Sequence, residues 1–459
     1  MRERQPEKIE LLRAELSPSA TRERAADTAQ DDSQQLPAHR KLRVPVVVFI
    51  IIGKVIGGGL VWFPKALSNT GWVGFLVMLI ALATSTCTGV FLARSWLVLM
   101  NWFPAKYRDE INRFPYPSIG YETFGVVGRR VTSILVGMYA FGFTVALYLV
   151  AADSLSLFFH LLDVRLSPCV WIPVVIAGAA PLLWFGTPKD MVGIGIAMGL
   201  ATVISALGLV VGSLLDIGEN PDLDPVSPTF FSISGALGLI LGAFGGQFVF
   251  PTLQHDMKCP ADMQVSGILG YLCVGVTYFA IGLSAFLVYG NLYNVVGADN
   301  VLALLSNKPI KIIVIFLLSS HLMVASVFMN NPVFQDLEDF LHIPYEISWQ
   351  RIVLRSVYSA LVLFVAVSLP SFPVYLSVVG GALSATVNGI LPTVLYFRLC
   401  SMEPPVGATP EGPLRWRRIL LIATVFLVCM SGAVLSTVSG IYNVLQNSHN
   451  MTLPCYMQR

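Results

Sequence analysis

The sequence predicts an all-α membrane protein with about eleven transmembrane helices, arranged as two five-helix repeats of opposite orientation plus one extra helix. Three observations predict this fold: the apolar composition, the number of apolar runs and two matching glycine-rich interruptions. Of the 459 residues, 55% are hydrophobic and 12% are charged, and the mean hydropathy is +0.70. Because soluble domains have roughly 25% charged residues, we expect the lipid bilayer to surround most of this chain.

Long apolar runs define the domain organisation, since a membrane-spanning helix needs about 20 consecutive, mostly apolar residues. Residues 44–215 form the first expected repeat, residues 233–397 the second, and 418–445 the eleventh helix. Residues 1–43 contain no aromatic residue and are rich in polar and charged ones, which predicts a disordered tail. Residues 446–459 are expected to form a short C-terminal tail. The eleven runs are 44–67, 72–99, 131–159, 169–186, 190–215, 233–254, 265–290, 311–330, 351–370, 373–397 and 418–445.

The distribution of Lys and Arg predicts the orientation, because the cytoplasmic loops of membrane proteins are enriched in both. With the N-terminus in the cytoplasm, 21 Lys and Arg residues fall in cytoplasmic segments and 5 fall on the opposite side. Without the tail, the numbers are 12 and 5. The C-terminus is therefore expected to be extracellular or lumenal. The membrane itself is expected to be either the plasma membrane or an endomembrane or vesicle. The glycosylation sequon at Asn450 falls on that side. Either Asn450 is glycosylated there, or the sequon is a chance match.

Two apolar runs, the first and the sixth, contain the same interruption. Residues 58–64 and 245–251 both read G-G-x-x-x-F-P. Paired glycines and a proline break a helix, and a break at membrane depth is tolerated only where it is buried in protein or lines a cavity. With five helices from one break to the other, the two breaks fall in repeats of opposite orientation. Such a pair indicates a transporter's binding site, whereas close helix packing is the alternative explanation for the glycines.

The two breaks offer different chemistry. Gly57, Gly58 and Gly59 would leave N–H groups free at the start of a half-helix, where the helix dipole also favours a carboxylate. Unwinding between Gly242 and Gly246 would free carbonyl groups, which suit an ammonium group. A zwitterion of amino-acid size would satisfy both breaks.

Three stretches of the chain resemble the amino acid/auxin permease family, whose helices have a LeuT-like layout. They are G-K-V-I-G-G-G-L-V-W-F-P-K-A-L-S-N-T-G-W from residue 53, the segment from Phe244 to Pro260, and the segment from Leu354 to Arg398. The last is most similar to the vesicular inhibitory amino acid transporter branch. The resemblance covers about residues 42–445. It implies a secondary active transporter that moves small neutral amino acids by alternating access.

The resemblance also implies where the substrate sits, which is between helices 1, 3, 6 and 8. Gly57, Gly58 and Gly59 would bind the carboxylate, and Gly245 and Gly246 would bind the amine. Tyr148 in helix 3 matches a position that closes over the substrate, although a core tyrosine is an equal alternative. Phe244, together with Phe248, would shape the pocket for the side chain.

Lys54 is the main departure from the family pattern. It lies about ten residues into the first run, roughly 15 Å deep at about 1.5 Å per residue, and a charge at that depth indicates function. We expect Lys54 to occupy the place of a sodium ion, which would make transport sodium-independent or proton-coupled. A structural lysine held by backbone carbonyls is the alternative. His321 and the adjacent Ser320, midway along helix 8, are candidates for a proton or coupling-ion site, with a packing histidine as the alternative.

Several functions have little support in the sequence. The seven cysteines show no C-x-x-C spacing, and no nucleophile or metal-ligand pattern appears, so we expect no enzyme, cofactor or metal site. Positive charge lies in loops, which argues against a nucleic-acid partner. An amino-acid-sensing transceptor, favoured by the long tail, and a sodium-coupled neutral amino acid symporter remain open; a channel lacks the polar stripe it needs. The acidic residues Asp216, Asp336 and Glu338 are interpreted as solvated.

Overall fold

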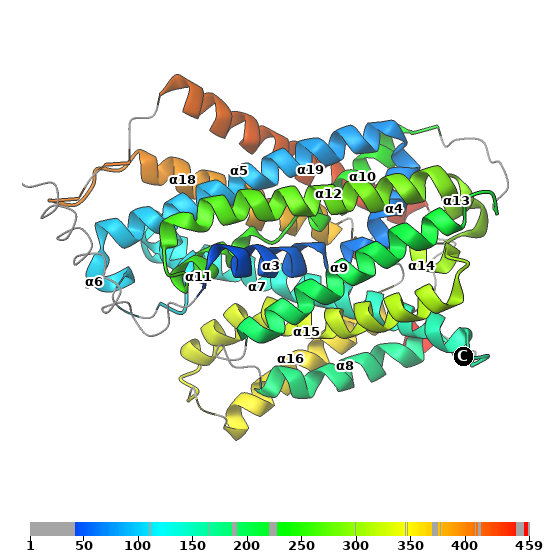
Figure 1. The fold of residues 1–459 in the computed structure, drawn as a ribbon. Coiled ribbons are helices and arrows are strands. Elements are labelled where there is room, and N and C mark those ends of the chain that lie inside the picture. The colour runs from blue at the N-terminus through cyan, green and yellow to red at the C-terminus, as the bar shows by residue number, and fades with distance from the viewer. Residues whose placement is uncertain are drawn as a thin grey trace, which may run out of the picture.

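A computed structural model describes residues 42–457 with short gaps, at 109, 111, 165, 186–190, 220–226, 299, 345, 347, 370–374, 377, 409, 412–414 and 447–453. In this part of the chain the regular structure is helical, apart from one isolated bridge between Leu42 and Met257. Asn450 and most of the expected N-terminal tail lie outside the described residues. Figure 1 shows the long helices lying side by side, with α3 in the middle of the bundle.

Each of the eleven expected segments contains a helix. The elements in order are α3 (Val44–Ile56), α4 (Gly59–Thr70), α5 (Trp72–Trp102), α6 (Pro104–Tyr107), α7 (Pro115–His160), α8 (Pro168–Phe185), α9 (Met191–Leu215), α10 (Phe230–Ala243), η2 (Gln247–Val249), α11 (Phe250–His255), η3 (Pro260–Asp262), α12 (Met263–Tyr289), α13 (Leu292–Val296), α14 (Val301–Leu304), α15 (Lys308–Phe340), α16 (Trp349–Ser368), the π-helix η4 (Val379–Ile390), α18 (Leu391–Cys400), α19 (Trp416–Gln446) and η6 (Cys455–Met457).

The number of membrane-crossing helices is smaller by length and composition than the expected eleven. In the described residues nine helices are long and apolar enough, and the bent pair α3 and α4 makes a tenth. The remaining candidate, α8, is a shorter apolar helix that contains Pro173 and Pro181. Two helices extend far beyond their apolar runs, because polar residues end a run without ending a helix. Helix α7 begins at Pro115, with a kink at Gly125, and α15 ends at Phe340.

Both predicted interruptions are present. The axes of α3 and α4 differ by 59°, and the chain turns at Gly57, where φ is 18° and ψ is −124°. In the second interruption α10 ends at Ala243, the chain continues through three non-helical residues, and helical structure resumes at Gln247. The glycines thus unwind the backbone at the places where the sequence predicts.

Helices α7, α8, α15 and α16 contact one another, and buried polar groups hold them together. Glu338 at the end of α15 is buried, in contrast to the solvated position expected from the sequence. Its carboxylate pairs with Arg351 at 3.0 Å and with Arg355 at 2.7 Å, both on α16. Arg355 also donates to the Leu183 carbonyl on α8. The two arginines explain the burial, since a buried charge is stable only when it is paired.

Asp216 at the end of α9 is also buried rather than solvated. One of its carboxylate oxygens accepts from the Tyr289 hydroxyl at 2.6 Å and from the Ser306 N–H at 2.9 Å. A carboxylate with two donors keeps its charge inside the protein at lower cost. This contact ties α9 to α12 and to the segment that leads into α15.

The beginning of α3 and the end of α11 are joined by backbone hydrogen bonds. The Leu42 N–H donates to the Asp256 carbonyl at 3.0 Å, and the Lys258 N–H donates to the Leu42 carbonyl at 2.9 Å. Leu42 is buried, although it falls within the expected tail. The two broken helices are therefore connected at the end of the bundle at which α3 begins, in addition to their contact at the breaks described below.

A disulfide joins Cys169, at the start of α8, to Cys455 in η6. We expect a non-reduced digest to contain these two cysteines in one crosslinked peptide pair, detected by mass spectrometry. A Cys169→Ser variant should lose the pair, and Cys273→Ser, at an exposed free cysteine, should retain it. Free thiols at both positions in freshly purified, alkylated protein would contradict this prediction.

Candidate functional site

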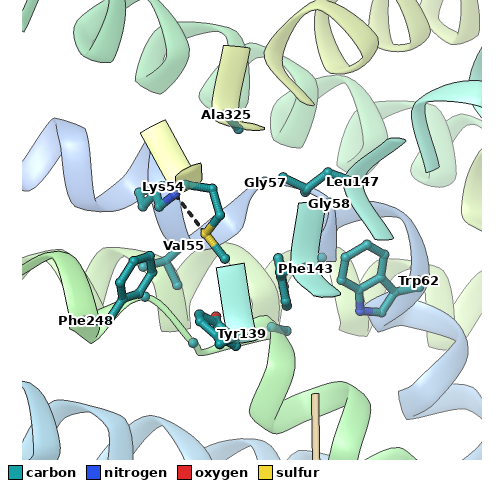
Figure 2. Close-up of a pocket in the computed structure, with 15 residues that line it drawn as sticks. Lys54, Val55, Gly57, Gly58, Trp62, Tyr139, Phe143, Leu147, Phe248 and Ala325 are labelled. Atoms are coloured by element: carbon teal, nitrogen blue, oxygen red, sulfur yellow. Dashed lines mark hydrogen bonds between the residues drawn. The ribbon is translucent and has the colours of Figure 1, made fainter. Parts of the chain in front are cut away.

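The two breaks meet at a cavity in the middle of the bundle. The cavity volume is about 20 Å³, which is room for about one water molecule. Its lining comes from the same four helices that the resemblance implied, here α3 with α4, α7, α10 with η2, and α15. Figure 2 shows Lys54 and Phe248 on one side of it and Trp62 on the other. The lining residues are Lys54, Val55, Gly57, Gly58, Gly59, Trp62, Tyr139, Phe143, Leu147, Ala243, Gly245, Gly246, Phe248, Ala325 and Met329.

The two breaks touch each other directly. Gly246 has a φ of 155°, a backbone conformation that residues with a side chain rarely adopt. A Cβ atom at Gly246 would also lie 2.8 Å from Cγ2 of Val55, closer than non-bonded carbon atoms approach. Glycine is therefore required on both grounds, and it lets the second break pack against the last turn of α3.

The first break presents unpaired N–H groups to the cavity. Helix α4 begins at Gly59, and the first N–H groups of a helix have no acceptor within that helix. In the described part of the chain, the N–H groups of Gly57 and Gly58 have no hydrogen-bond acceptor either. These groups, with the positive end of the α4 dipole, form the local chemistry that binds carboxylates at helix starts.

The carbonyl side of the breaks differs from the sequence expectation. The Tyr271 hydroxyl donates to the Phe244 carbonyl at 3.0 Å. The Tyr278 hydroxyl lies 2.9 Å from the Ile56 carbonyl oxygen and 3.3 Å from the Val55 and Ala243 carbonyl oxygens. Two α12 side chains thus occupy several carbonyls that we expected to be free. At the second break, the Gly245 carbonyl is the one for which the described residues supply no donor.

The N–H groups of the second break are bound by a side chain that sequence reasoning missed. The Asn388 side-chain oxygen, on η4, accepts from the N–H groups of Gly246 and Phe248, both at 3.2 Å. The Asn388 amide nitrogen donates to Ser384 at 3.3 Å, one turn earlier on the same helix. Asn388 is buried and fixes the shape of the second break.

We expect Asn388→Ala to lower the free energy of unfolding by about 1 kcal/mol, because it leaves the buried Phe248 N–H without its acceptor. The Gly246 N–H, by contrast, keeps the Gln247 side-chain oxygen at 3.0 Å. The thermal midpoint of the detergent-solubilised protein measures this loss. Asn294→Ala, at an exposed asparagine on α13, is the control for a lost asparagine and should lose little. Equal midpoints for wild type and Asn388→Ala would show that the contact does not stabilise the break.

Lys54 lies between the first break and α15. Its ammonium nitrogen is 3.2 Å from the Met329 sulfur and 5.5 Å from the centroid of the Phe248 ring. No Asp or Glu oxygen lies within 4.0 Å of it in the described residues, and no backbone carbonyl accepts its proton there. The structural alternative, a lysine held by carbonyls, is therefore not what the geometry shows. A cation near a thioether and a ring face has weak partners only.

His321 and Ser320 have different surroundings. His321 is buried on α15, and its Nδ1 lies 3.3 Å from the Thr202 hydroxyl. Its Nε2 has no hydrogen-bond partner in the described residues and points to the first break, where a Cβ atom at Gly57 would lie 3.5 Å away. Ser320 is exposed on the outer face of α15 and donates to the Phe316 carbonyl. The structure brings His321 to the break and places Ser320 away from it.

Tyr148 and Phe244 do not line the cavity. The Tyr148 hydroxyl lies 2.7 Å from the Ser326 hydroxyl and links α7 to α15. The Phe244 ring packs against Phe63 and Tyr278. Their neighbours line the cavity instead, namely Leu147, preceded by Tyr139 and Phe143 on the same face of α7, and Phe248 in η2.

The sequence matches a known protein family over most of its length. The model of the transmembrane amino acid transporter protein family matches residues 40–445. The chain belongs to this family. Two similar relatives are amino acid transporters of Arabidopsis thaliana. AVT1H is 24% identical over 409 residues, covering 84% of this chain and 87% of the relative, and AVT1I is 21% identical over 368 residues, covering 78% and 87%.

Solved transporters share the fold of this amino acid transporter family member. MhsT in complex with L-phenylalanine aligns with a TM-score of 0.57 at 11% identity, covering 87% of this chain and 97% of MhsT. The nucleobase-cation-symport-1 family transporter Mhp1 aligns with a TM-score of 0.56 at 14% identity, covering 90% and 94%. These structures show a LeuT-like fold, and the family match makes the chain a multi-pass membrane protein and an amino acid transporter rather than an enzyme.

Proposed function

We propose that the protein moves small neutral amino acids across a membrane by alternating access, with the substrate bound where the two breaks meet. The observation that carries this proposal is the cavity itself, which the N–H groups of the first break and the backbone of Gly245 both line. A zwitterion matches a site with donors on one wall and an acceptor on the other. The structural relative bound to L-phenylalanine supports an amino-acid substrate at the level of the fold.

In the proposed complex the carboxylate binds the N–H groups of Gly57, Gly58 and Gly59, and His321 Nε2 adds a donor beside Gly57 when it carries a proton. The ammonium group binds the carbonyl of Gly245, with Gly246 shaping this wall. The side chain faces the rings of Tyr139, Phe143 and Phe248. In the described part of the chain no Asp or Glu lines the cavity and Lys54 does, so a positively charged side chain is unfavourable there and a neutral one is favoured.

The contacts between the helices support the proposal of alternating access. The cavity holds about one water molecule, so substrate entry requires helices to separate. The broken helices are joined to each other at Leu42 and at Gly246. By contrast, Glu338 and its arginines join α8, α15 and α16, and the contact between Tyr148 and Ser326 joins α7 to α15. We infer that the first group rocks against the second, because each is held together by its own contacts.

The proposed coupling is sodium-independent or proton-driven. Lys54 places an ammonium group between the break and α15, where it supplies the positive charge that a bound sodium ion would bring. His321 is the proposed proton carrier, since it is buried and its Nε2 faces the break. A sodium-coupled symporter is the alternative, and the sodium dependence of uptake distinguishes the two.

The proposed topology has a cytoplasmic N-terminus and an extracellular or lumenal C-terminus. The charge distribution supports this orientation, and the disulfide at Cys455 adds independent support because disulfides persist in oxidising compartments. Figure 1 shows the C-terminus at the end of the bundle opposite α6, and Lys106, Arg108 and Arg113 lie in or near α6 in the sequence.

The alternative function is an amino-acid-sensing transceptor, which signals through its tail and transports little. The tail leads directly into the Leu42 contact between the broken helices. Deletion of residues 1–40, followed by measurement of both signalling and uptake, distinguishes the two functions.

The substrate pose is tested by competition in proteoliposomes that contain the purified protein. A transported neutral amino acid should lose at least about tenfold in competing potency as its methyl ester and again as its N-acetyl derivative, because each derivative removes one of the two backbone contacts. Competition by both derivatives at the potency of the parent amino acid would contradict binding at the breaks. Uptake into the same proteoliposomes without an imposed ion gradient is the baseline.

A further inference from the structure

Tyr278 has an unusual position among the buried tyrosines, because its hydroxyl touches both broken helices. It is fully buried on α12. Carbonyl oxygens of Val55 and Ile56, at the end of α3, and of Ala243, at the end of α10, all lie within 3.3 Å of the hydroxyl oxygen. The Phe63 ring of α4 stacks on the Tyr278 ring, with centroids 4.5 Å apart. One side chain thus contacts α3, α4 and α10 at their broken ends.

The Tyr278 hydroxyl is surrounded by more carbonyl acceptors than it can donate to. A tyrosine hydroxyl has one proton, so it donates fully to one carbonyl, and the other two oxygens receive at most a share. Three carbonyl oxygens around one point, at the negative ends of two half-helices, form the kind of cluster that binds an alkali cation in unwound membrane helices. In this chain the cluster surrounds a neutral donor.

We propose that the Tyr278 hydroxyl holds a carbonyl site that would otherwise take a monovalent alkali cation, and that it thereby couples the two broken helices without an ion. Tyr278 is a positioning residue in this proposal: it joins the end of α3 to the end of α10 and leaves no room for a sodium ion. The proposal rests on the proposed sodium-independent transport and names a second residue, besides Lys54, that produces it.

The surroundings of Tyr278 support a fixed position. A Cβ atom at Gly59 would lie closer than 3.0 Å to the Tyr278 hydroxyl, so the glycine of the first break makes space for it. The Phe244 ring packs edge-to-face on Tyr278 with centroids 5.3 Å apart. The Phe63 and Phe244 rings, whose centroids are 6.2 Å apart, pack against adjacent sides of the phenol and hold it in place, so its donor is presented to the carbonyls without rearrangement.

Cation-dependent thermal stability is the test, measured on the full-length protein in detergent with sodium chloride or choline chloride. Tyr278→Ser removes the ring and opens space beside the three carbonyls, so its thermal midpoint should rise with sodium but not with choline. Sodium should also stimulate its uptake by roughly tenfold relative to choline. Tyr278→Phe keeps the ring without the donor and should lose uptake in both salts. Tyr271→Phe is the matched control, because Tyr271 donates to one carbonyl only, and it should show no sodium response.

The outcomes separate this proposal from the proposed function. A folded Tyr278→Ser protein whose midpoint is the same in sodium and choline would overturn the carbonyl site. A Tyr278→Phe protein with wild-type uptake would overturn the coupling role. If the wild-type protein itself needs sodium for uptake, sodium independence fails, whereas the carbonyl site is still judged by the change in midpoint between wild type and Tyr278→Ser.

Discussion

Replacing Gly59 by alanine should reduce amino-acid uptake by at least about hundredfold while the protein remains folded. A Cβ atom at this position would overlap the Tyr278 hydroxyl and also approach its ring, so either the start of α4 or the tyrosine must move. Overpacking of a tightly filled site costs about 1–3 kcal/mol or more, and here it also displaces the N–H groups proposed to bind the carboxylate. Initial rates of uptake into proteoliposomes measure the loss.

The control is the same substitution at a glycine that has space. Gly193 is exposed on α9, and a Cβ atom there meets no atom within 4 Å. Gly193→Ala should therefore transport at the wild-type rate and elute as the same monodisperse peak. Wild-type uptake by Gly59→Ala would mean that the first break does not have the close packing described here.

Removing the ammonium group of Lys54 should reduce uptake by at least about thirtyfold. Lys54→Ala loses the positive charge that favours a carboxylate in the cavity, together with the weak contacts to the Met329 sulfur and the Phe248 ring. Among the residues that the structure describes, this is the only charge that lines the cavity. Lys54→Asn leaves an amide in the same space, and we expect sodium to restore part of its uptake.

The sodium dependence of wild type is the reference for Lys54. At fixed pH, replacing sodium by choline should leave wild-type uptake unchanged and should lower the uptake of Lys54→Asn. Lys308→Ala, at the start of α15 and outside the cavity, is the control for a lost lysine and should behave as wild type in both salts. Wild-type uptake that collapses in choline would contradict the role proposed for Lys54.

The broken helices were predictable because their signal is local. Consecutive glycines and a proline weaken an α-helix wherever they occur in a sequence. The two segments around Gly58 and Gly245 unwind where the sequence indicates. The apolar runs are local in the same sense, and each contains a helix. The ends of α7 and α15 were missed because the polar residues that terminate an apolar run are compatible with helix.

Side-chain directions were harder to predict, because one position along a helix rotates a side chain by about 100°. The predicted residues Tyr148 and Ser320 do not line the cavity. Their neighbours Leu147 and His321 face the break, and of these two only His321 was predicted from the sequence. Tyr278 and Asn388 were missed because their roles depend on packing between segments far apart in sequence. The spacing of Tyr271 and Tyr278, seven residues apart on one face of an apolar helix, was the one available signal.

The disulfide shows a different limit. Seven cysteines allow many pairings, and the sequence alone contains no information on which two meet. Cys169 and Cys455 are 286 residues apart and are brought together only by the arrangement of α8 and the C-terminal segment.

The most direct test is uptake of a panel of radiolabelled amino acids by the purified full-length protein in proteoliposomes, with imposed proton and sodium gradients. We predict saturable, counterflow-competent uptake of at least one small neutral amino acid, independent of the sodium gradient and abolished by Gly59→Ala. Failure of every amino acid in the panel to bind or to be transported, by protein that is folded and correctly inserted, would contradict the central claim.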